Sequence, residues 1–79
     1  MHKDPLSIPT DFVKSSNIDS IGYDNASRTM IVAFKNRSVY AYHPVTQAGY
    51  ESLRTADSVG KHFHAHFKNN KLLTVEKIN

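Results

Sequence analysis

Residues 30–42, MIVAFKNRSVYAY, decide the fold, because two alternating stretches flank a short polar segment. Alternate residues of a β-strand share one face, so this pattern predicts an antiparallel hairpin. A three-residue loop, 35–37, places Val32 opposite Tyr40, so that Tyr40 and Tyr42 share the apolar face of Met30, Val32 and Phe34. A two-residue loop, 36–37, would instead turn both tyrosines to the opposite face. We favour the three-residue loop because its face is more apolar, although Arg37 then needs a positive φ that costs roughly 1 kcal/mol relative to glycine.

The flanking sequence extends this hairpin into an α+β domain. We expect strands at 17–23, 28–34 and 38–43, with a turn at 24–27, and helices at 46–55 and 58–69. Thr46 can cap the first helix, and Ser58 or Asp57 the second. The predicted fold is a three-stranded antiparallel β-meander followed by two short helices packed on one face. Its predicted core is Met30, Val32, Phe34, Tyr40, Tyr42, Tyr50, Leu53, Val59, Phe63 and Phe67.

The 79 residues suffice for one small domain, which we place at 13–70. Residues 1–12 contain two prolines and little periodicity, so we expect a flexible leader whose end is pinned to the core by Phe12 and Val13. For the C-terminal tail, 71–79, two alternatives stay open. It could add an edge strand or lie over the core.

Composition excludes several classes of protein. The absence of cysteine rules out disulfides and thiolate metal sites, and no apolar run could cross a membrane or serve as a signal peptide. We therefore expect a soluble, cytoplasmic protein. The net charge of +3 and the pI near 9.3 exclude an acidic mimic of nucleic acid and permit contact with nucleic acid.

The order of these features matches a known family. The chain carries, in order, Val13, Ser15-Ser16, Ile18, Ser20-Ile21-Gly22-Tyr23-Asp24, Met30-x-Val32-x-Phe34, Tyr40-x-Tyr42 and Ala56-x-Ser58-x-Gly60-x-x-Phe63. Over about residues 13–68 it resembles the KTSC domain, named after the C-terminal extension of some lysyl-tRNA synthetases. The resemblance implies a compact module, often a stand-alone bacterial or phage protein, with a suggested role in RNA binding and no catalytic residues. Arg37 stands where the family's hairpin commonly has glycine, and Thr46 where a proline is usual.

Basic side chains are the candidate contacts for a nucleic acid or another partner. The predicted set is Arg28, Lys35, Arg37, Lys61, His62, His66, Lys68 and Lys71. Within this set the loop 35–37 is the most specific candidate, because it presents two cations outward on a short loop. The lysines of the predicted helix have a plainer explanation, since lysines on a helix usually only solvate its outer face. Tyr40 and Tyr42 could stack unpaired bases, but the favoured register assigns them to the core.

Three histidines on the second predicted helix raise the question of a metal. His62 and His66 lie one turn apart and could reach the same ion, while His64 points elsewhere. With only two ligands, a polar helix face is the favoured interpretation, and we expect no metal and no cofactor. Protonation of these histidines below about pH 6.5 should strengthen binding to a polyanion.

Two classes of function fit the sequence, and neither is enzymatic. No spacing places a histidine beside Ser15, Ser16 or Asp19, and there is no glycine-rich phosphate loop. The leading hypothesis is a small module that binds RNA or another nucleic acid. The alternative is a protein-interaction module, such as a phage or mobile-element inhibitor of a host complex. The oligomeric state stays open, and a homodimer through a sheet edge is one option.

Overall fold

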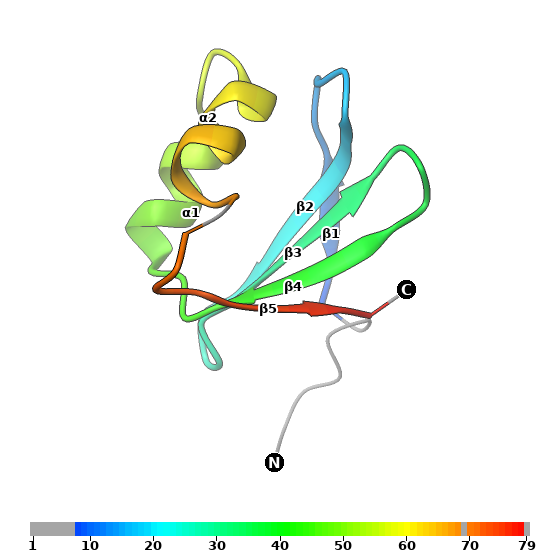
Figure 1. Ribbon diagram of the computed structural model, residues 1–79. Coiled ribbons are helices and arrows are strands. Elements are labelled where there is room, and N and C mark those ends of the chain that lie inside the picture. The colour runs from blue at the N-terminus through cyan, green and yellow to red at the C-terminus, as the bar shows by residue number, and fades with distance from the viewer. Residues whose placement is uncertain (1–7, 69, 79) are drawn as a thin grey trace.

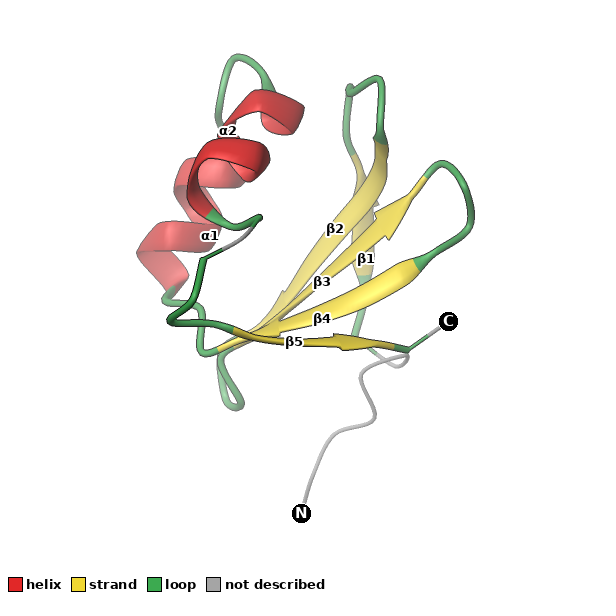
Figure 2. Cartoon of the chain, in the orientation of Figure 1, coloured by secondary structure: helices red, strands yellow, loops and turns green. Residues whose placement is uncertain are grey.

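The computed structural model describes residues 8–68 and 70–78, in which five strands and two helices form one α+β unit (Figure 1). The strands are β1 (Thr10–Phe12), β2 (Ile18–Asp24), β3 (Thr29–Phe34), β4 (Val39–His43) and β5 (Thr74–Lys77). They form one antiparallel sheet in chain order. Helices α1 (Gln47–Arg54) and α2 (Val59–His66) follow β4 and cover one face of the sheet (Figure 2).

The α+β class is confirmed, but the prediction of three strands is wrong because an edge strand flanks each side of the meander. β1 lies within the predicted leader, while residues 1–7 of that leader fall outside the described residues. β5 lies in the tail, which therefore adds an edge strand. All residues of both edge strands are exposed, so neither shows the apolar alternation that reveals a strand in a sequence.

The central hairpin has the predicted three-residue loop. Met30 pairs with Tyr42 and Val32 with Tyr40, so both tyrosines are on the helix-covered face. The Phe34 N–H donates to the Ser38 carbonyl at 2.8 Å and closes the loop. Arg37 has a φ of 73°, the left-handed conformation expected there.

Both helices begin at the predicted caps. The Thr46 hydroxyl accepts from the Gly49 N–H at 3.0 Å, and the Ser58 hydroxyl accepts from the Lys61 N–H at 3.3 Å. Helix α2 ends at His66, three residues earlier than predicted. The Asn70 side-chain amide donates to the His66 carbonyl at 3.0 Å and satisfies an acceptor that the helix end leaves free.

The main core lies between the helices and the sheet. It contains eight of the ten predicted core residues, together with Ile18, Ile21 and Val45, which the prediction omitted. Ile18 and Ile21 reach the same face because a register shift between residues 18 and 20 interrupts the alternation. The prediction is wrong for Phe34 and Tyr40, which are only partly buried at the margin of this core.

A second, smaller core covers the opposite face of the sheet. Ile8, Ile31 and Ala41 are all buried there. The chain before β1 crosses this face so closely that a Cβ on Gly22 would lie 2.2 Å from the Pro9 carbonyl oxygen, so only glycine fits. Val13 packs against the main core, but Phe12, which we expected to pin the leader, is 84% exposed.

Candidate nucleic-acid interface

A cleft of about 300 Å³ opens between α2 and the end of the sheet that carries the β3–β4 loop. Its lining comes from three places, namely the approach to β2, the β3–β4 hairpin and one face of α2. The lining residues are Asn17, Ile18, Phe34, Asn36, Tyr40, Tyr42, Gly60, Phe63, His64 and Lys68. Both α1 and α2 lie on this side of the sheet (Figure 2), so the cleft belongs to the helix-covered face.

Aromatic rings form the inner wall of this cleft. The Phe34 ring meets the Tyr40 ring edge to face at 5.7 Å, and Phe63 of α2 contacts Tyr42 in the same manner at 5.4 Å. Burial, followed by the charge of Tyr40, raises the pKa of Tyr42 to about 12. Because Tyr40 is only partly buried, part of its surface is open to a ligand.

Polar side chains form the rim of the cleft. Asn36 accepts from the Ser38 N–H at 3.0 Å through Oδ1, and its amide nitrogen donates to no other described residue. The Asn17 carbonyl accepts from the Lys35 N–H at 2.9 Å, which fixes the chain where it enters β2. The rim therefore offers hydrogen-bond donors and, at Lys68, a full positive charge.

A second concavity of about 380 Å³ adjoins the cleft at the first turn of α2. It shares Asn17, Gly60 and His64 with the cleft and adds three serines, 15, 16 and 58, together with Lys61. A Cβ on Gly60 would lie 3.1 Å from the Ser15 hydroxyl oxygen, so glycine allows the helix to approach this loop closely. The pair of concavities thus runs along one side of α2.

The structure brings only two of the eight predicted contact residues into these concavities. Lys68 lines the cleft and Lys61 lines the second concavity. Lys61 lies in the first turn of α2, whereas Lys68 lies just beyond the end of the helix, where its N–H donates to the Phe63 carbonyl at 3.0 Å. His64 lines both concavities and so connects the two lysines. We call Lys61, His64 and Lys68 the α2 stripe.

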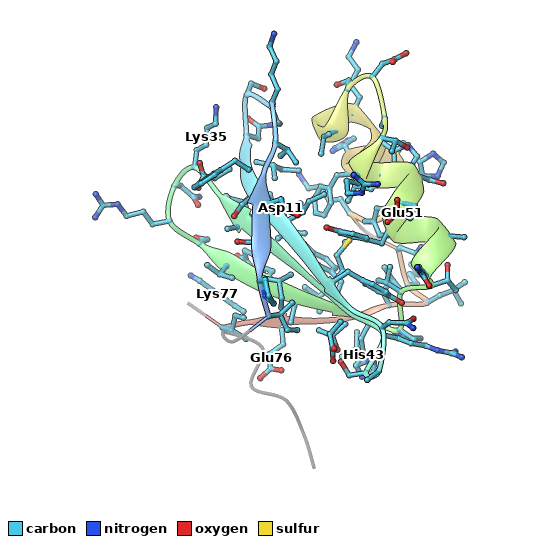
Figure 3. All side chains as sticks on the ribbon, turned by 180° about the vertical axis from the view of Figure 1, so that it is seen from behind. Asp11, Lys35, His43, Glu51, Glu76 and Lys77 are labelled. Atoms are coloured by element: carbon cyan, nitrogen blue, oxygen red, sulfur yellow. The ribbon has the colours of Figure 1, made fainter. Side chains whose placement is uncertain are left out.

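The other predicted contacts are dispersed, and no single basic patch unites them. Lys35 lines a separate groove beside β1, together with Asp11 and Arg54. Arg28 lies in the β2–β3 turn, at the opposite end of β3 from the 35–37 loop. Figure 3 shows these two ends of the sheet, marked by Lys35 and His43. Arg37 and Lys71 are exposed and line neither concavity.

His62 and His66 form a pair away from the α2 stripe. Their ring centroids are 4.4 Å apart, with the planes tilted by 38°. Burial, followed by the neighbouring His66, lowers the pKa of His62 below its ordinary value. Within residues 8–68 and 70–78, no group of three histidine, aspartate or glutamate side chains could hold a metal ion.

Sequence reasoning missed most of the cleft lining. The helical spacing of residues 61, 64 and 68 is a signal that could have placed His64 with the two lysines. The half-buried Tyr40 has no such signal, because its exposure depends on where α2 lies. The lining residues absent from the predicted set are Asn17, Ile18, Phe34, Asn36, Tyr40, Tyr42, Gly60, Phe63 and His64.

Comparison with known proteins identifies the family. The family described as KTSC domain matches residues 14–70, which is well over half of the chain. The chain belongs to the KTSC domain family. All residues that line the two concavities fall within the matched range, whereas β1 and β5 lie outside it. The candidate interface is therefore part of the KTSC domain itself.

Two individual proteins support this assignment. An "uncharacterized protein" of Stutzerimonas stutzeri (strain A1501) is 36% identical over 56 residues, which cover 71% of this chain and 79% of that protein. The crystal structure of a KTSC domain protein from Yersinia pestis superposes with a TM-score of 0.86 at 29% identity. That superposition covers 92% of this chain and 100% of the other. No helix in the described part of this KTSC domain is long and apolar enough to cross a membrane.

Proposed function

We propose that this KTSC domain is a non-enzymatic module that binds single-stranded nucleic acid, RNA in particular, through the cleft beside α2. One observation carries the proposal. A partly buried tyrosine, Tyr40, lines a cleft whose rim bears Lys68 and the amide side chains of Asn17 and Asn36. Stacking of an unpaired base on an aromatic ring contributes roughly 1–3 kcal/mol, and a neighbouring cation attracts the phosphate.

Electrostatics favour the same class of ligand. The chain carries a net charge of +3, and the α2 stripe concentrates cationic groups beside the cleft. Asp57 and Glu76 bound a stretch of the sequence that contains no acidic residue, so no carboxylate of α2 opposes an approaching phosphate. The lack of cysteine fits the reducing environment of the cytoplasm, which is where we place the protein.

Salt-dependent binding of a labelled single strand tests this proposal. An oligoribonucleotide of about twelve residues should bind at about 50 mM salt and lose affinity steeply by about 200 mM, as followed by fluorescence anisotropy. Substitution of Tyr40→Leu should weaken binding about tenfold, because it retains the packing but removes the stacking ring. Substitution of Lys68→Gln should weaken binding and reduce the salt slope by about one unit.

Lys71→Gln is the matched control for Lys68→Gln, because it removes the same charge three residues away without altering the cleft lining. It should change affinity less than about twofold. If no single strand binds at low salt, or if Lys71→Gln weakens binding as much as Lys68→Gln, the cleft is not a nucleic-acid interface.

A protein-interaction module is the second candidate function. Phe12 and Leu72 are exposed by 84% and 86%, which is unusual for large apolar side chains in a small domain. Such residues could contact another protein, including a host complex or a second copy. Capture of a defined protein that depends on Phe12, with no retention of any single strand at low salt, would favour this candidate over the first.

A further inference from the structure

We propose that the cleft and the adjoining concavity form one track for a dinucleotide unit of a single strand, with one base in the cleft and the next phosphate in the second concavity. This inference rests on the proposed function and specifies its ligand. The two concavities adjoin, because both are lined by Asn17, Gly60 and His64. Their linings differ sharply in chemistry, so we assign a different part of the ligand to each.

The cleft suits a base. It is lined by four aromatic rings, from Phe34, Tyr40, Tyr42 and Phe63. Tyr40 and Phe34 are only partly buried, and we assign the stacking surface to Tyr40. The amide nitrogens of Asn17 and Asn36 donate to no described residue, which leaves donors for the edge of the base.

The second concavity suits a phosphate, and its lining contains no phenylalanine or tyrosine. The Ser15 hydroxyl oxygen accepts from the Asn17 and Ile18 N–H groups, each at 3.2 Å, and the Ser58 hydroxyl oxygen accepts from the Lys61 N–H. Neither hydroxyl donates to another described residue, so both protons are available to an anion. Lys61 adds a positive charge at the first turn of α2, where the helix dipole also favours an anion.

The α2 stripe sets the length of the track. Lys61, in the first turn of α2, lines the second concavity, and Lys68, just beyond the end of α2, lines the cleft, while His64 lines both. With one cation in each concavity, the two lysines can contact the phosphates on either side of the bound base. The track therefore has room for a short unit of the strand, and nucleotides beyond it should contribute little through these concavities.

A length series tests this inference. Uridine 5′-monophosphate and the 5′-phosphorylated di- and trinucleotides of uridine are titrated into ¹⁵N-labelled protein, and the Gly60 backbone amide and the Asn17 side-chain amide are followed by NMR. The dinucleotide should bind at least about tenfold more tightly than the mononucleotide, and a third nucleotide should add less than about threefold. Both reporter signals should shift with the dinucleotide.

Variants assign each concavity its part of the ligand. Lys61→Gln should abolish the advantage of the dinucleotide and leave mononucleotide affinity within about twofold. Tyr40→Leu should weaken mono- and dinucleotide alike, while Lys71→Gln should alter neither. A spectrum with native dispersion confirms that each variant is folded.

Two results would overturn the track without affecting the proposed function. In the first, single strands bind but affinity rises evenly with every added nucleotide. In the second, Lys61→Gln weakens mono- and dinucleotide equally. If no single strand of any length binds at low salt, the proposed function fails together with this inference.

Discussion

Arg37 adopts a backbone conformation at the β3–β4 loop that suits glycine better than arginine. Its φ of 73° lies in the left-handed region, where a Cβ costs roughly 1 kcal/mol. Substitution of Arg37→Gly should therefore raise the free energy of unfolding by about 0.5–1 kcal/mol, as measured by urea denaturation.

Arg37→Ala separates the backbone effect from loss of the side chain, because alanine keeps the Cβ. This variant should be no more stable than the parent protein. Equal stabilisation by alanine and glycine would show that the arginine side chain or its charge, rather than the φ angle, is unfavourable at this position.

Gly22 is constrained by a neighbouring backbone atom. A Cβ at this position would lie 2.2 Å from the Pro9 carbonyl oxygen, far inside van der Waals contact. Gly22→Ala should lower the free energy of unfolding by about 1–3 kcal/mol, measured by urea denaturation, because the segment before β1 must move away. In a chain that begins at Thr10 the same substitution should cost less than half as much. An equal cost in both backgrounds would contradict this explanation.

At the scale of elements, α2 has two distinct polar faces. The α2 stripe lines the concavities, whereas His62 and His66 contact each other with their rings tilted. The pKa of His62 is lowered in the folded protein, so protonation favours the unfolded chain. The contribution of neutral His62 to the stability of the fold is therefore present above about pH 6.5 and is lost as the pH falls through the lowered pKa. Unfolding at pH 5 should thus require less urea than at pH 7.5, by less than about 1 kcal/mol because solvent screens the pair.

His62→Asn should reduce this difference between the two pH values, and His64→Asn is the matched control that should retain it. Titration of the His62 ring proton by NMR should give a midpoint below 6.5, and His66→Asn should shift that midpoint upward. An unchanged midpoint in the His66→Asn variant would leave burial as the only cause.

The sequence was informative where local chemistry determines an element. Strict alternation and loop length predicted the β3–β4 register, and the hydroxyls of Thr46 and Ser58 predicted both helix starts. The edge strand β1 escaped prediction, and β5 was only one of two alternatives for the tail, because main-chain pairing rather than burial of alternate side chains holds both in the sheet.

The candidate site was harder to predict than the fold. Its basic residues are visible in the sequence, but their grouping depends on how α2 lies across the sheet. Tyr40 shows the difficulty. The strand register that turns Tyr40 toward the helix-covered face was predicted correctly. In so small a domain, however, a side chain at the margin of the core is also partly exposed, and Tyr40 therefore lines the cleft.

At the scale of the whole molecule, the small core and the cleft lie on opposite faces of the sheet. Ile8, Ile31 and Ala41 form the small core on the face opposite the helices. Ile8→Ala should lower the free energy of unfolding by about 2 kcal/mol, as measured by urea denaturation, through loss of buried apolar volume. It should leave affinity for a single strand within about twofold, because the cleft lies on the other face. Loss of binding in a folded Ile8→Ala variant would show that the two faces are coupled.

The four tyrosines fall into two groups with different surroundings. Tyr23 and Tyr50 stack at 5.1 Å beside α1, whereas Tyr40 and Tyr42 line the cleft. The chain contains no tryptophan, so tyrosine dominates its near-ultraviolet emission and its circular dichroism above the phenylalanine bands. The domain therefore contains two native optical probes, one for the packing of α1 and one for occupancy of the cleft. Phenylalanine replacements at residues 23 and 50 would leave the signal of the cleft pair to be observed without an attached dye.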